Sequence, residues 1–144
     1  MHVFTLQLPS TRAEWRGVAH DYNTRWNMPH CLGALDGKHI TIIKPDNSGA
    51  TFFNYKHNFS IVLMALVNAH YEFTYVDVGV NGRVSDGGVF NRSHLLNHLD
   101  NDQNIPPPEP LPAYMDTNPI PYFIAADDTF PLKSYIISPI HFAP

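Results

Sequence analysis

The sequence contains one cysteine, Cys31, and few charged residues. A single cysteine excludes an intramolecular disulfide and a zinc site built from four cysteines. Charged residues are 15% of the chain, whereas about 25% is usual. Acidic residues outnumber Lys and Arg by 13 to 9, which argues against a domain that binds nucleic acid through bulk positive charge. The composition excludes these classes of protein and identifies none.

Long apolar runs are also absent. No run of about 18 apolar residues occurs, so no membrane-spanning helix is expected. Charged residues interrupt the first 30 positions, which excludes the apolar core of a signal peptide. A chain of 144 residues has the length of one domain and can bury about 70% of its unfolded surface. We therefore expect one domain of a reducing compartment, with no membrane partner.

The pattern of apolar residues predicts an α/β domain. A capping box of Thr11 and Glu14 begins the first helix. Runs rich in β-branched or aromatic residues predict strands, two of them joined as an antiparallel hairpin. Three consecutive strands followed by a helix and a strand favour a mixed sheet. The expected elements are a helix over 11–23, strands over 32–43, 59–67 and 71–78, a helix from 86 to 99, a strand over 122–126 and the start of a helix at 131–137.

Proline is concentrated in one segment. Residues 105–121 contain seven of the 13 prolines. Proline lacks the backbone N–H and fixes φ, so this segment is expected to be a long loop rather than a helix or a central strand. We divide the chain into a lead-in helix and turn over 1–30 and an α/β domain over 31–144 that contains this loop.

Three aspartates fall at the ends or interruptions of predicted elements. Asp36 interrupts an apolar strand, Asp86 lies between a glycine-rich turn and a helix start, and Asp127 ends the last strand. An unpaired carboxylate that is buried in a sheet is costly, and a bound cation is one reason to retain it. Carboxylates without cysteine favour Mg²⁺ or Mn²⁺. Alternatively, the three acids are a turn residue, a helix cap and a strand-end residue without a ligand.

The segment CLGALDGKH, from Cys31 to His39, resembles the Gly-hydrophobic-hydrophobic-Asp-Gly-x-His motif of PIF/Harbinger-type transposases and the nucleases derived from them. The resemblance covers about residues 14–140 in the same order. The other matching segments are 54–56, 59–67, 73–79, 82–90 and 127–132, with Trp15 and the turn 26–29.

This resemblance implies a ribonuclease-H-like fold, a mixed sheet with flanking helices, and metal-dependent DNA endonuclease activity of the DDE superfamily. It implies that Asp36, Asp86 and Asp127 are catalytic ligands of Mg²⁺ or Mn²⁺. The family's fourth acid, a Glu on a later helix, would lie beyond Pro144 with the C-terminal part of the fold, and the upstream helix-turn-helix region is absent. We therefore expect a truncated nuclease domain that cleaves phosphodiesters with two metal ions. The alternative is an inactive remnant that acts as a metal-binding or protein-interaction module.

The resemblance also implies partners and roles for neighbouring side chains. The implied partners are DNA and a separate Myb-like DNA-binding protein, and the implied location is the nucleus, with the cytoplasm as a second location. Lys38 and Lys56 either contact DNA phosphates or are solvated, and His39 either contacts the scissile phosphate or packs in the strand. Asp77 either orients Lys38 or His39, or is an exposed strand residue.

Overall fold

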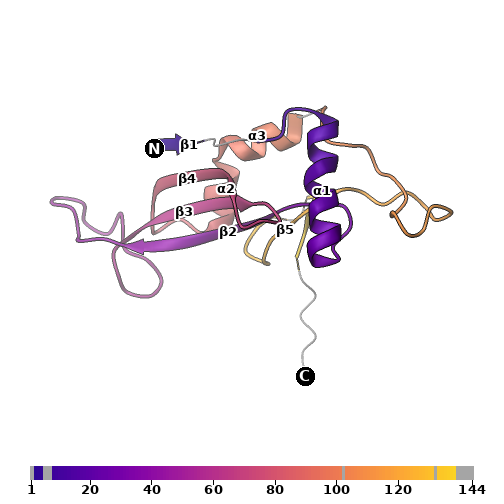
Figure 1. Cartoon of the computed structure of the whole chain (residues 1–144). Helices are drawn as coiled ribbons and strands as arrows, with labels where there is room; N and C mark the ends of the chain where they lie inside the picture. The colour runs from indigo at the N-terminus through magenta and orange to yellow at the C-terminus, as the bar shows by residue number, and fades with distance from the viewer. Residues whose placement is uncertain (1, 5–7, 102, 132, 139–144) are drawn as a thin grey trace, which may run out of the picture.

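The computed structural model (Figure 1) describes residues 2–4, 8–101, 103–131 and 133–138. Its sheet has six strands, and three helices pack against it. The elements are β1 (His2–Phe4), α1 (Arg12–Trp26), β2 (Cys31–Thr41), β3 (Ser60–Val67), β4 (Phe73–Asn81), α2 (Asp86–Asn91), α3 (His94–Asn101), β5 (Phe123–Ala125) and β6 (Ile136–Ile137).

The strands form one mixed sheet in the order β1-β4-β3-β2-β5-β6. Strands β2, β3 and β4 pair antiparallel in chain order. The short link 68–72 joins β3 to β4, and the longer segment 42–59 joins β2 to β3. Strand β5 pairs parallel to β2, and β6 pairs parallel to β5, after the crossover through α2 and α3. These three antiparallel strands are extended by β1 at one edge, antiparallel to β4, and by two parallel strands at the other. The arrangement confirms the expected ribonuclease-H-like mixed sheet with flanking helices.

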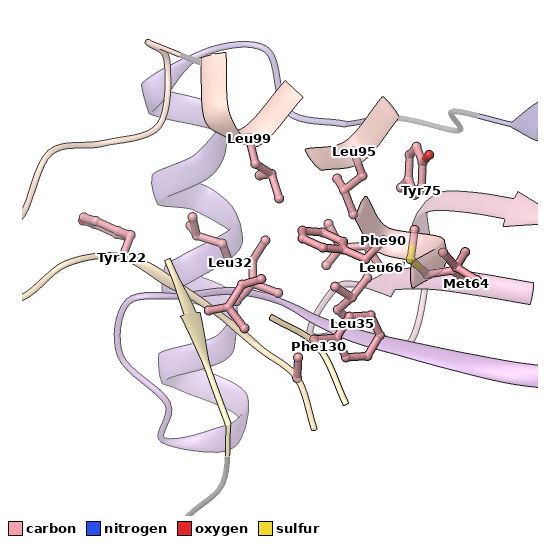
Figure 2. Close-up of a cluster of buried hydrophobic side chains, with 14 of the residues drawn as sticks. Leu32, Leu35, Met64, Leu66, Tyr75, Phe90, Leu95, Leu99, Tyr122 and Phe130 are labelled. Carbon is pink, nitrogen blue, oxygen red and sulfur yellow. The ribbon is translucent and has the colours of Figure 1, made fainter. Parts of the chain in front are cut away.

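The core lies between one face of this sheet and the helices. Leu35, Leu66 and Tyr75 are paired in register across β2, β3 and β4, so their side chains share that face. All three are buried. In Figure 2, Phe90 of α2 and Leu95 of α3 point into the same cluster. In Figure 1, α1 crosses the end of the sheet at which β2 begins.

Helix α1 confirms the predicted first helix. The Thr11 side chain accepts a hydrogen bond from the Glu14 N–H at 3.1 Å, and the Glu14 carboxylate accepts one from the Ser10 N–H at 2.7 Å. The helix continues three residues beyond the predicted end at position 23. It ends at Trp26, because Asn27 adopts the left-handed conformation with φ 54°.

Two elements differ from the prediction. The helix expected from 86 to 99 is broken into α2 and α3. Ser93 causes the break, because its hydroxyl donates to the Phe90 carbonyl at 2.7 Å and accepts from the Leu96 N–H at 3.3 Å, which begins a new helix. The helix start expected at 131–137 is wrong: Ile136 and Ile137 form a strand beside β5, as β-branched residues prefer. Strand β1 was not predicted.

The proline-rich segment 105–121 contains no helix or strand among the named elements, which confirms the predicted loop. Hydrogen bonds nevertheless join residues near the two ends of this segment. Glu109 and Ile120 exchange two backbone hydrogen bonds of 3.2 and 2.8 Å, and the Glu109 carboxylate pairs with Arg16 of α1 at 2.5 Å. The segment is therefore attached to α1. Within the described residues, no helix has both the length and the apolar content that crossing a membrane requires.

Candidate functional site

Asp36 and Asp127 lie side by side at the junction of β2 and β5. The parallel register pairs Ala34 with Ala125, and each aspartate follows two residues later along its own chain. A step of two residues returns to the same side of a strand, so the two carboxylates share one side. Both side chains are exposed, and they line one shallow pocket of about 310 Å³ with Leu35, Ala125 and Ala126.

Local hydrogen bonds orient both carboxylates. Asp36 Oδ1 accepts the Gly37 N–H at 2.9 Å. Asp127 Oδ1 accepts the Thr129 N–H at 2.9 Å and the Thr129 hydroxyl at 2.5 Å. Among the described residues, no hydrogen bond or ion pair occupies Oδ2 of either aspartate. Each acid therefore has one oxygen held by the protein and one available to a ligand.

Asp86 is the first residue of α2, and its side chain lies outside the described residues. The next residue, Gly87, packs against Thr129, and this contact places the backbone of Asp86 beside the turn that follows Asp127. A Cβ built on Gly87 would lie 2.4 Å from the carbonyl oxygen of Thr129, so only glycine permits this approach. The fold therefore unites Asp36 and Asp127 in one pocket and places the start of α2 against the same turn.

Sequence analysis missed the role of Gly87. The signal was present, because two consecutive glycines, Gly87 and Gly88, at a helix start weaken the helix and need a structural reason. The reason is the contact between Gly87 and Thr129, which joins the segment that contains Asp86 to the segment that contains Asp127.

The donor set suits a hard divalent cation. Two carboxylates without cysteine or histidine match Mg²⁺, which is bound by one or two carboxylates and retains several waters. Within the part of the chain that the structure describes, no group of three His, Cys, Asp or Glu side chains is placed to hold a metal ion. The third ligand that the family resemblance implies, Asp86, lies at the start of α2.

A second, larger pocket adjoins the aspartates, and we call it the basic cleft. It has a volume of about 560 Å³, and none of its described lining residues is acidic. It meets the carboxylates through Gly37, next to Asp36, and Thr129, which is bonded to Asp127. Its lining residues are Gly37, Lys38, His39, Tyr55, Lys56, Gly82, Arg83, Val84, Ser85 and Thr129.

His39 is oriented from beneath the basic cleft. Its Nδ1 lies 2.7 Å from Oγ of the buried Ser60, which also accepts a hydrogen bond from Asn54 Nδ2 at 2.8 Å. Asn54 is itself buried, and its Oδ1 accepts the N–H of Lys56 at 2.9 Å. With Nδ1 engaged, Nε2 of His39 is the ring nitrogen that can bind a ligand.

Asp77 is not the exposed strand residue that was one expectation. Its side chain is fully buried on the core face, and among the described residues neither carboxylate oxygen has a hydrogen-bond partner. The other expectation, that it orients Lys38 or His39, has no hydrogen bond to support it, since Ser60 orients His39. Burial raises the pKa of Asp77, while His94 and Tyr75 act in the opposite direction.

Comparison with known proteins decides the family. A family model described as DDE superfamily endonuclease matches residues 35–142, a range that includes all three predicted aspartates. The chain belongs to this family. Membership supports a transposase-derived endonuclease domain, and endonucleases of this superfamily generally use divalent metal ions.

One curated relative of the DDE endonuclease domain is Protein ALP1-like of Arabidopsis thaliana. It is 28% identical to this chain over 119 residues, which are 81% of this chain and 29% of the relative. The chain thus spans less than a third of the length of that relative. No solved structure matches.

Proposed function

We propose that this domain cleaves DNA phosphodiester bonds with two divalent cations, Mg²⁺ or Mn²⁺, bound by Asp36, Asp86 and Asp127. When bound, such ions supply the activation of a water and the stabilisation of the leaving oxygen. The protein contributes fixed carboxylates. Gly37 and Thr129 hold Oδ1 of Asp36 and Asp127, which leaves Oδ2 of each to bind a cation.

One observation carries this proposal. Asp36 and Asp127 are 91 positions apart in sequence (127 minus 36), yet the parallel β2–β5 register brings them into one pocket. Two exposed carboxylates on one side of a sheet repel each other, and among the described residues neither has a basic partner. A bound cation would offset that repulsion.

The test is cleavage of supercoiled plasmid DNA by the purified chain in Mn²⁺, with calorimetric Mn²⁺ binding as a second readout. Asp36→Asn and Asp127→Asn keep the side-chain shape and remove the charge. We expect each to lower cleavage by at least about 100-fold and to weaken Mn²⁺ binding. Asp128→Asn is the matched control, because Asp128 is exposed beside Asp127 but does not line the pocket. Cleavage and binding that survive in both Asp36→Asn and Asp127→Asn would refute the assignment.

A second candidate is a catalytically inactive module that binds a metal ion or a protein. The observation in its favour is that Asp36 and Asp127 line a shallow, exposed pocket, which suits binding of a metal ion without catalysis as well. It predicts Mn²⁺ binding that depends on Asp36 and Asp127 but no cleavage by the wild-type chain. Metal-dependent cleavage would exclude it.

The proposed activity belongs in the nucleus, with a separate Myb-like DNA-binding protein as a partner. Support comes from the family resemblance and from the net charge of −4, which leaves the domain little positive charge for binding DNA by itself. A fluorescent fusion of the whole protein should accumulate in the nucleus, and affinity purification should recover a Myb-like protein. Exclusion of the fusion from the nucleus would contradict this location.

A further inference from the structure

The basic cleft gathers positive charge in an acidic protein. Three of the nine Lys and Arg residues, Lys38, Lys56 and Arg83, line one pocket of about 560 Å³. They come from three separate elements: β2, the loop before β3, and the turn between β4 and α2. Among the described side chains, which do not include that of Asp86, none that is acidic lines the pocket, so positive charge is concentrated there although the whole chain has a net charge of −4.

The three cations are available to a ligand. Elsewhere, Arg16 pairs with Glu109 and Lys133 pairs with Asp100. Lys38, Lys56 and Arg83 are exposed, and among the described residues none of them forms an ion pair. Lys56 lies over the ring of Tyr55, which is 74% exposed. Cations beside an exposed aromatic ring are the groups that proteins use to bind phosphates and stacked bases.

The cleft is a formed site rather than a chance gathering of mobile side chains. Its three elements meet at Ser60, which is fully buried. Ser60 Oγ bonds His39 and Asn54, and its carbonyl accepts the Gly82 N–H at 2.8 Å. A Cβ on Gly82 would lie 2.1 Å from Ser60 Oγ, so the turn next to Arg83 can approach this closely only with glycine.

The position of the cleft indicates what it binds. Lys38 follows Asp36 by two residues on the same side of β2, which is a step of about 7 Å. The cleft therefore begins beside the carboxylate of Asp36 and continues from there toward Lys56 and Arg83, so it lies along the path of a strand that is bound at the aspartates.

We propose that the basic cleft binds the phosphate backbone of the DNA strand next to the scissile bond. Lys38, Lys56 and Arg83 contact phosphates, and Nε2 of His39 donates a hydrogen bond to a phosphate in the same cleft. The location relative to the scissile bond rests on the proposed nuclease function. The binding of the backbone does not, because it requires neither metal ions nor cleavage.

The experiment measures binding of a short fluorescein-labelled DNA duplex by anisotropy in EDTA, over salt concentrations between about 50 and 200 mM. The double variant Lys56→Gln and Arg83→Gln should lower the slope of log K against log salt by about 2, since each lost phosphate contact contributes about 0.9. Affinity near 0.1 M salt should fall about 10-fold or more per contact. The variant Lys56→Arg with Arg83→Lys keeps both charges and should retain wild-type affinity.

The matched control removes the same charge elsewhere. Arg12→Gln with Arg25→Gln changes two arginines of α1, at the opposite end of the sheet from the loop that contains Lys56 (Figure 1). It should leave the slope within about 0.5 of the wild-type value. An equal loss in the control and the cleft variant would show that only net charge matters and would overturn the proposal, as would a wild-type chain that does not bind the duplex at low salt.

Plasmid cleavage in Mn²⁺ separates this inference from the proposed function. Binding that depends on Lys56 and Arg83, without wild-type cleavage, would support the cleft and refute the nuclease activity of this chain. Cleavage with binding unchanged in the cleft variant would refute the cleft and leave the nuclease activity intact.

Discussion

At the scale of single residues, burial separates the aspartates into two kinds. Asp36 and Asp127 are exposed and line a pocket, whereas Asp77 is buried without a hydrogen-bond partner among the described residues. The strand alternation in the sequence places Asp77 on the side of Tyr75. The alternation does not tell which side of β4 is buried, because Val76 and Val78 make the side opposite Asp77 apolar too.

Asp77 predicts a specific pH dependence of stability. Burial raises its pKa, so the folded state binds this proton more tightly than the unfolded state. The free energy of unfolding should therefore fall as pH rises from the ordinary aspartate value of about 4 through the raised pKa. Asp77→Asn removes this ionisation, so its stability relative to wild type should increase across that window.

Urea unfolding at a series of pH values checks this expectation. Asp46→Asn, at an exposed turn, is the control and should show the wild-type pH dependence. If the stability difference between Asp77→Asn and wild type does not change with pH, Asp77 does not have the raised pKa in solution.

At the scale of elements, strong periodicity predicted α1, β2, β3, β4 and β5, whereas elements that depend on one local or distant contact were missed. The break between α2 and α3 depends on the Ser93 hydroxyl, and β1 has only three residues, so that its pairing with β4 defines it. The candidate site divides in the same way. The motifs identified Asp36, Asp86 and Asp127, but the contact of Gly87 with Thr129 needs three-dimensional packing.

Gly87→Ala tests whether that contact positions α2. The added Cβ would lie 2.4 Å from a backbone oxygen, which cannot move as a side chain does. We expect the free energy of unfolding to fall by about 1–3 kcal/mol. We also expect Mn²⁺ binding to weaken, because α2 and the Asp127 turn are forced apart. Urea unfolding and calorimetric titration measure the two effects.

Gly17→Ala is the matched control for Gly87→Ala. Gly17 lies inside α1 with nothing within 4 Å of the added Cβ. Alanine should stabilise the helix there by about 0.5–1 kcal/mol and leave Mn²⁺ binding unchanged. If Gly87→Ala binds Mn²⁺ as wild type does, the contact with Thr129 does not place Asp86 at the metal site.

At the scale of the whole molecule, charge and core both depend on segments distant in sequence. The net charge of −4 argues against binding of DNA through bulk positive charge. A sum over the chain does not show that Lys38, Lys56 and Arg83 line one pocket together. The core is also assembled from segments distant in sequence, since Trp15 of α1 packs in the same cluster as Leu32 and Ile124 of the sheet.

The shared core bears on the division into 1–30 and 31–144, which stays a prediction. Trp15 is fully buried, so we expect α1 and the sheet to unfold together rather than as a separate lead-in and domain. In a Trp26→Phe background, Trp15 is the remaining tryptophan of the two. Its fluorescence and the far-ultraviolet circular dichroism should then show coincident urea transitions.

Trp15→Ala should lower the free energy of unfolding by about 3–5 kcal/mol, because the cavity it leaves lies in the main core. That is a large part of the 5–15 kcal/mol typical of a domain, so both α1 and the sheet should unfold at much lower urea. His20→Ala, on the exposed side of α1, should change stability by less than about 0.5 kcal/mol. In the Trp26→Phe variant, a Trp15 fluorescence transition that precedes the loss of circular dichroism would instead show that α1 detaches first. The remaining core would then hold the sheet together without α1.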